Sequence, residues 1–144
     1  MIGYLAHNSQ EIDEVNQLEK LLNQHKIETI NPFRKQGFIT EYIEDNSIVI
    51  NKYVVQIDRK DISNSDFILL YFPTKAQTIG VICEMMLAYS GRQYIISCVP
   101  KQHMMHPWMQ YYSDAIFFKN NSKDIIFYIK SLKIYPRKWF WKTS

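Results

Sequence analysis

The residue with the clearest chemical potential in this sequence is Glu84. It is the only charged side chain in the apolar stretch 79–89, whose composition is typical of a buried helix. An ionised carboxylate in such surroundings costs on the order of several kcal/mol unless it is hydrogen-bonded or shifted in pKa. Gly80, one turn earlier, would let a ligand approach this carboxylate closely. Glu84 is therefore a candidate functional acid, and a structural Glu bonded to backbone amides or to an arginine fits the same pattern.

Asp58 is a second acidic candidate. It lies at the margin of the apolar stripe of a helix expected over residues 50–61. A surface acid paired with Arg59 or Lys60 would give the same pattern. The pattern alone therefore favours a surface role for Asp58.

Histidine and aromatic residues gather after the fourth expected strand. His103 and His106 have the spacing of metal ligands on a helix, but no third Cys, Asp or Glu stands near them, and we therefore predict no metal site. Trp108 could stack on a nucleobase, and core or interface packing explains it equally simply. No cofactor is expected.

Short apolar runs alternate with longer helical patterns along the chain. Strands separated by helices of this length indicate right-handed crossovers and a parallel sheet. We predict an α/β fold, a three-layer sandwich with a central, mostly parallel sheet of about five strands, flavodoxin-like or Rossmann-like. Ser9 is expected to cap the first helix, and Gly91 to end a later one in the left-handed conformation. The expected strands cover residues 2–6, 27–30, 66–72, 94–99 and 115–118, and the expected helices cover 12–22, 50–61, 80–90 and 122–132.

Length and composition describe a single domain. The chain has 144 residues, of which 47% are hydrophobic, enough for a core without disulfide or metal staples. We assign residues 1–134 to one domain and residues 135–144 to an aromatic and basic tail. Two lone cysteines, no secretory signal and no apolar run of membrane length predict a cytoplasmic protein. Residues 67–144 hold 10 basic and 3 acidic groups, which permits an anionic ligand there or a merely solvated basic face.

The order and spacing of several short motifs resemble the nucleoside 2-deoxyribosyltransferases and their relatives, the 2-deoxynucleoside 5-monophosphate N-hydrolases. The match runs from about residue 1 to residue 114. It rests on Tyr4-Leu5-Ala6 at the end of the first strand, Asp58 on a helix, Asp61-Ile62 and Ser65-Asp66 before an apolar strand, and Thr78-Ile79-Gly80-Val81-Ile82-Cys83-Glu84 followed by Ala88-Tyr89.

The resemblance implies a chemical role for three of these residues. Glu84 would attack the anomeric carbon of a nucleoside and form a covalent glycosyl-enzyme. Asp58 would protonate or hydrogen-bond the departing base. Tyr4 would orient the Glu84 carboxylate through its hydroxyl, and ordinary packing at a strand end explains Tyr4 equally well.

Two departures from the family bear on the substrate. His7 stands where the family usually has Gly, in a loop that contacts sugar or phosphate, and Thr78 stands where deoxyribosyltransferases often have Asp. Thr78 together with Gly80 looks more like the monophosphate hydrolases, in which hydroxyls and backbone amides hold the phosphate. Asn8, Ser9 and Thr78 are thus candidates for contact with a phosphate or a 5-hydroxyl.

The resemblance also implies the partners. The expected ligand is a small nucleoside or nucleotide, and neither a membrane nor a nucleic acid is expected. In the family, the region of residues 101–114 reaches into a neighbouring subunit's pocket, which implies a homo-oligomer, a dimer or higher. The tail at 135–142 is expected to pack on a partner subunit. Three activities stay open: transfer between bases, hydrolysis of a monophosphate with release of free base, and catalytically inactive nucleotide binding or sensing.

Overall fold

The computed structural model describes residues 1–34, 48–73, 79–118 and 121–132, with backbone alone for 48–51. Its centre is a five-stranded sheet in the order β2-β1-β3-β4-β5, and every strand pair is parallel. This confirms the predicted α/β fold class. The strands are β1 (Ile2–His7), β2 (Glu28–Ile30), β3 (Phe67–Tyr71), β4 (Tyr94–Cys98) and β5 (Ala115–Phe117).

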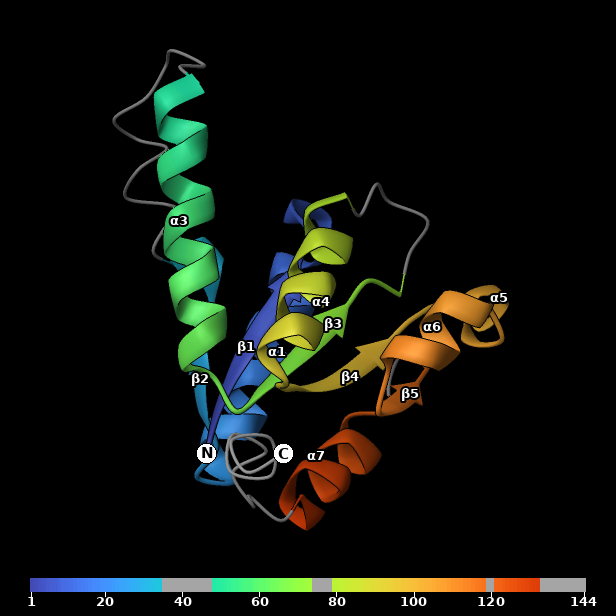
Figure 1. Ribbon diagram of the computed structural model, residues 1–144. Helices are drawn as coiled ribbons and strands as arrows, with labels where there is room; N and C mark the ends of the chain where they lie inside the picture. Colours follow the sequence, from blue (N-terminus) through green and yellow to red (C-terminus); the bar gives the residue numbers. More distant parts are fainter. Residues whose placement is uncertain (35–47, 74–78, 119–120, 133–144) are drawn as a thin grey trace, which may run out of the picture.

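Helices cover both faces of the sheet (Figure 1). Alternate side chains of a strand point to opposite faces, so Leu5 and Phe67 join the core under α1 and α7, while Tyr4 and Ile68 join the core under α3 and α4. The helices are α1 (Ile12–Gln24), α3 (Ile48–Asn64), α4 (Ile79–Gly91), α5 (Lys101–Met104), α6 (Pro107–Tyr112) and α7 (Ser122–Ser131), with a 3-10 turn η1 (Ser9–Glu11) before α1.

The strand order reverses at the centre of the sheet. β1 pairs with β2 on one side and with β3 on the other, with Gly3 opposite Phe67 and His7 opposite Tyr71. In such sheets ligands bind beyond the carboxyl ends of the strands, near the point of reversal. The helices α3 and α4 precede and follow β3, and they contact each other on one face of the sheet.

The predicted helix end at Gly91 is wrong in one respect. The helix α4 includes Gly91, which does not have a positive φ, and the left-handed residue is Arg92 with φ 63°. The N–H of Arg92 donates to the Tyr89 carbonyl at 3.1 Å, and the N–H of Gln93 donates to the Ala88 carbonyl at 3.0 Å. This pair of bonds closes the helix one residue later than predicted, so the left-handed position falls on Arg92.

None of the helices in the described part of the chain is long and apolar enough to cross a membrane.

Two glycines differ sharply in the room beside them. A Cβ at Gly3 would lie 2.1 Å from Cζ of the buried Phe67 ring, whereas a Cβ at Gly80 would meet nothing within 4 Å. We expect Gly3→Ala to lower the free energy of unfolding by about 1–3 kcal/mol because it overpacks the core. The matched variant Gly80→Ala should leave that free energy unchanged or raise it by up to about 1 kcal/mol. Urea unfolding of both variants measures this, and equal losses would contradict the packing of Phe67 on Gly3.

Candidate active site

A buried tyrosine and a half-buried glutamate form the centre of the candidate site. The Tyr4 hydroxyl donates a hydrogen bond to Oε1 of Glu84 at 2.9 Å. Tyr4 is fully buried in the middle of β1, and Glu84 lies in the middle of α4, which packs against the same face of the sheet. The fold thus joins two residues that are 80 positions apart in the chain.

Asp58 of α3 completes a group of three. It lies close enough to both groups for its negative charge to raise the pKa of the Tyr4 phenol and of the Glu84 carboxyl. Its side chain is half-buried. The inward-facing side of β1 and the two helices that cover it therefore supply a phenol and two carboxylic acids to one spot, and Asp58 does not have the purely surface position that its pattern favoured.

Burial and charge shift the pKa values of this group. Burial raises the pKa of the Glu84 carboxyl to about 8, the hydrogen bond from Tyr4 opposes the rise, and the negative charge of Asp58 adds to it. Burial and the two carboxylates also raise the pKa of the Tyr4 phenol, which therefore stays neutral. In the part of the chain that the structure describes, no Lys or Arg forms an ion pair with Glu84. A perturbed acid without a cationic partner is more typical of a functional site than of a structural one.

Gly80 leaves open space one turn before Glu84. It lies in the first turn of α4, is exposed, and has no neighbour within 4 Å of where a side chain would begin. The close approach of a ligand at this glycine stays a prediction. Thr78 lies outside the described residues, and its contact with a phosphate or a 5-hydroxyl stays a prediction.

Asn8 caps the turn after β1, which is a correction to the predicted cap at Ser9. The Asn8 side chain accepts a hydrogen bond from the backbone N–H of Gln10 at 2.9 Å, because the chain leaves β1 still extended at Asn8. Ser9 is the first residue of η1 and is exposed. Its hydroxyl has no part in the cap, and the roles of both residues in substrate binding stay predictions.

His7 is not brought together with Glu84. Counting along β1, its side chain points to the face opposite Tyr4, where it is buried with its ring centre 4.7 Å from that of Phe33. Its Nδ1 lies 2.7 Å from the Leu5 carbonyl, and burial lowers the pKa of the imidazole. The structure therefore gives His7 a packing role, and substrate contact by this residue stays a prediction.

Trp108, on α6, lies beside the side of α4 that faces away from Glu84. It is exposed on α6 and stacks on Tyr112 with ring centres 5.7 Å apart. It also borders a cavity of about 450 Å³. Three residues of α4 line this cavity, and they lie on the side of the helix opposite Glu84 and Gly80. That cavity is lined by Phe72, Ile82, Met85, Met86, His103, His106, Trp108 and Met109.

The aromatic residues that gather after the fourth strand form a cluster, and sequence reasoning missed that Tyr89 of α4 joins it. The ring centres of Tyr89 and Tyr112 are 4.7 Å apart in an edge-on contact, and those of Tyr111 and Tyr112 are 4.8 Å apart. No local pattern connects Tyr89 with this segment, because the contact depends on how α4 and α6 pack. Over the described ranges, no group of three or more His, Cys, Asp or Glu side chains is placed to hold a metal ion.

No protein-family model matches this chain, and no curated protein matches it in sequence. Solved structures do share its fold. The 2-deoxyribosyltransferase of Bacillus psychrosaccharolyticus matches with a TM-score of 0.72 and 16% identity, over 88% of this chain and 90% of that one. The CMP N-glycosidase of Clostridium botulinum matches with a TM-score of 0.63 and 16% identity, over 90% of this chain and 98% of that one.

A third structure, a conserved protein from Enterococcus faecalis, matches with a TM-score of 0.57 and 15% identity, over 90% of this chain and 97% of that one. At such identities the likeness shows the fold. Two of these three structures are nevertheless of the kinds that the sequence resemblance indicated, and the fold expected from that resemblance is confirmed.

Proposed function

We propose that this protein cleaves the N-glycosidic bond of a 2-deoxynucleoside or its monophosphate through a covalent intermediate on Glu84. The observation that carries the proposal is the hydrogen bond from the buried Tyr4 hydroxyl to the Glu84 carboxyl, which forms no ion pair with a Lys or Arg among the described residues. The fold shared with a 2-deoxyribosyltransferase and a CMP N-glycosidase supports the same class of reaction.

The geometry suits this chemistry. Breaking the bond between sugar and base passes through an oxocarbenium-like sugar, which a carboxylate on one face and a proton donor at the leaving base both stabilise. Glu84 attacks the anomeric carbon as the carboxylate, and Tyr4 holds its orientation. Asp58 gives a proton to the leaving base and later takes one from the incoming acceptor. Gly80 leaves room for the sugar beside Glu84.

The acceptor decides between a transferase and a hydrolase. We propose transfer to a second base as the primary activity. Hydrolysis of a monophosphate is the second candidate, favoured by Thr78 in place of an Asp and by the fold shared with a CMP N-glycosidase. A protein that binds nucleotides without turnover would keep the same fold and would not need Glu84 as a nucleophile.

We also propose that residues 1–134 form one domain that assembles into a homo-oligomer in the cytoplasm. Large apolar side chains of α4 and α6 are exposed on adjoining elements, which is typical of an interaction surface. The exposed free thiol of Cys83 suits a reducing compartment. The exposed side chains that define this surface are Ile79, Ile82, Tyr89, Trp108 and Tyr111.

The activity is tested by incubating the protein with deoxynucleosides and deoxynucleoside monophosphates, with and without a free acceptor base. We expect exchange of bases, and loss of turnover by at least about 10³-fold in Glu84→Ala, since the covalent step is removed. Asp58→Asn should lose about 10²- to 10⁴-fold. Free base alone would identify a hydrolase, and binding without any turnover would identify a sensor and refute the enzyme. Undiminished activity of Glu84→Ala would remove Glu84 as the nucleophile.

The raised pKa of Glu84 predicts that this carboxyl destabilises the fold at neutral and alkaline pH. Its pKa rises from 4.5 to about 8 on folding, so the folded protein holds the proton more tightly and loses stability as the pH rises between those values. Glu84→Gln should therefore unfold with a free energy at least about 1 kcal/mol higher than the wild type at pH 8, with a smaller gain at pH 5.

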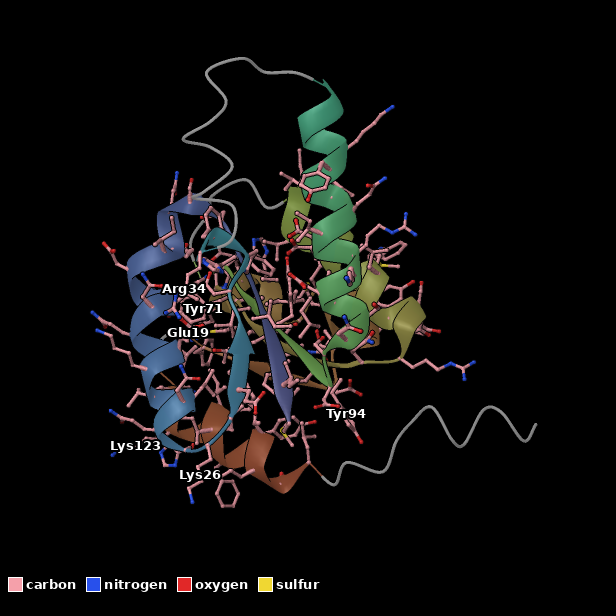
Figure 2. The ribbon with its side chains drawn as sticks, turned by 90° about the vertical axis from the view of Figure 1, so that its left-hand side faces the viewer. Glu19, Lys26, Arg34, Tyr71, Tyr94 and Lys123 are labelled. Carbon is pink, nitrogen blue, oxygen red and sulfur yellow. The ribbon has the colours of Figure 1, made fainter. Side chains whose placement is uncertain are left out.

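The matched control is Glu19→Gln on the opposite face. Glu19 is also a buried carboxylate, but it accepts a hydrogen bond from Thr29 at 2.7 Å and forms an ion pair with Arg34 (Figure 2). This substitution should lower the free energy of unfolding by about 1–3 kcal/mol. Denaturant melts of both variants across pH measure the difference, and destabilisation by Glu84→Gln at pH 8 would show that Glu84 is structural.

The oligomer is tested by replacing an exposed aromatic residue on the proposed surface. Sedimentation of the wild type should give a dimer or larger species. Trp108→Asp should shift this toward monomer because it places a charge within the interface, while Phe127→Asp, at an even more exposed aromatic site on α7, should not. A monomeric wild type at micromolar concentration would contradict the assembly.

A further inference from the structure

A second cavity lies beside the amino ends of β4 and β5, whereas sheets of this kind bind their substrates beyond the carboxyl ends of the strands. Its volume is about 550 Å³, within the range of about 300–1,000 Å³ that is common for small-molecule sites. It is bordered by the last turns of α4 and α6 and by the residues just before β4 and β5. We call it the tyrosine cavity, because Tyr89, Tyr111 and Tyr112 line it together with Gln93, Ser113 and Asp114.

Gln93 brings a buried and unsatisfied amide to this cavity. The residue is 4% exposed, and its Oε1 has no hydrogen-bond partner among the described residues. The amide lies against Gly91, since a Cβ on that glycine would be 2.3 Å from Oε1. Buried polar atoms in folded proteins nearly always have a partner, because an unsatisfied one costs free energy. An unpartnered amide at the wall of a cavity of this size indicates a partner that enters the cavity.

Other polar groups of the wall are already held in place. Oδ2 of Asp114 accepts a hydrogen bond from the backbone N–H of Ile95 at 2.8 Å. The hydroxyl of Ser113 lies 2.7 Å from the hydroxyl of the buried Ser97. These bonds stabilise the wall, whereas the amide of Gln93 keeps hydrogen-bonding capacity for a ligand.

Three tyrosine rings form the aromatic part of the wall. The edge-on contacts of Tyr112 with Tyr89 and with Tyr111 join the rings into one surface. Tyr89 and Tyr111 are exposed, so their rings can contact a planar molecule that enters the cavity. Both also belong to the proposed assembly surface, which the tyrosine cavity therefore borders.

We propose that the tyrosine cavity is a second ligand site and that it binds a free nucleobase. A nucleobase combines a planar ring, which suits the tyrosines, with neighbouring donor and acceptor groups that pair with both atoms of a carboxamide. Glutamine pairs in this way with N6 and N7 of adenine. The choice of a nucleobase among planar heterocycles rests on the proposed function, in which free bases are acceptors or products.

The second site is separate from the proposed catalytic residues. Neither Tyr4, Asp58 nor Glu84 lines the tyrosine cavity. Glu84 lies in the middle of α4, while the cavity begins at the last turn of that helix. Binding of a base in the cavity therefore does not require an intact catalytic group.

The first test follows the side-chain amide of Gln93 by NMR in ¹⁵N-labelled wild-type protein. Adenine, cytosine, hypoxanthine and uracil are added in turn, with indole as a planar control that lacks a neighbouring donor and acceptor. We expect at least one base to shift the Gln93 amide resonances until they saturate, and indole to leave them unchanged. Failure of all four bases to shift these resonances would overturn the proposal.

The second test compares Gln93→Leu with Gln24→Leu, a matched change at an exposed glutamine of α1. Affinity for the base is measured from the backbone resonances of Ser113 and Asp114. We expect Gln93→Leu to weaken binding at least about tenfold without lowering the free energy of unfolding, because the buried amide oxygen has no partner to lose. Gln24→Leu should bind as the wild type does. Unchanged affinity in Gln93→Leu, or equal losses in both variants, would contradict the site.

The two proposals fail separately. If the wild type turned over no nucleoside, the proposed function would fail, while the Gln93 resonances would still decide whether the cavity binds a base. Glu84→Gln should show the same Gln93 shift as the wild type. Disappearance of that shift in Glu84→Gln would show that the base binds at Glu84 and would overturn the second site.

Discussion

The constraint on which the rest of this structure depends is a half-buried carboxylic acid that forms no ion pair with a Lys or Arg in the described part of the chain. Glu84 and Glu19 show the two ways in which the fold handles such a group. Glu19 is neutralised by Arg34 and accepts a hydrogen bond from Thr29, as expected of a structural carboxylate. Glu84 has a phenol and a second acid as its neighbours. The surroundings of Glu84 favour its protonated form over its ionised form. A carboxyl with such a raised pKa is a candidate for acid–base or nucleophilic chemistry.

The topology explains why these groups meet. β1 is an interior strand of the sheet, with β2 on one side and β3 on the other, so the side chains of its middle residues are fully covered. The helices before and after β3 pack on the same face as Tyr4. Tyr4, a fully buried residue of β1, thus lies near Asp58 of α3 and Glu84 of α4. Because the parallel crossovers determine where α3 and α4 lie, the meeting of these three residues follows from strand order.

The helix α4 separates two environments. One flank carries Glu84 and Gly80, and the other contributes Ile82, Met85 and Met86 to an apolar cavity beside α5 and α6. This explains why the helix is apolar on nearly all sides although it lies at the edge of the core. The aromatic cluster of Tyr89, Tyr111 and Tyr112 continues the second flank. The proposed catalytic residue and the proposed assembly surface therefore lie on opposite sides of one helix.

The amino-acid sequence alone was enough to predict the parallel sheet, the buried β3 strand and the unusual position of Glu84, because each depends on apolar periodicity within a short window. It also indicated Asp58, although its pattern alone favoured a surface role. The helix end after Gly91 was misplaced by one residue, and the cap at Asn8 was missed, since both depend on hydrogen bonds between backbone and neighbours that no local pattern specifies.

Only the tertiary structure decided which groups face each other. His7 and Tyr4 belong to the same short strand, yet they point to opposite faces because their separation is an odd number of residues. Tyr4, Asp58 and Glu84 come from three separate elements, and the contact between them exists only once strand order and helix packing are set. Periodicity reports whether a side chain is buried, and the fold determines which partner it meets there.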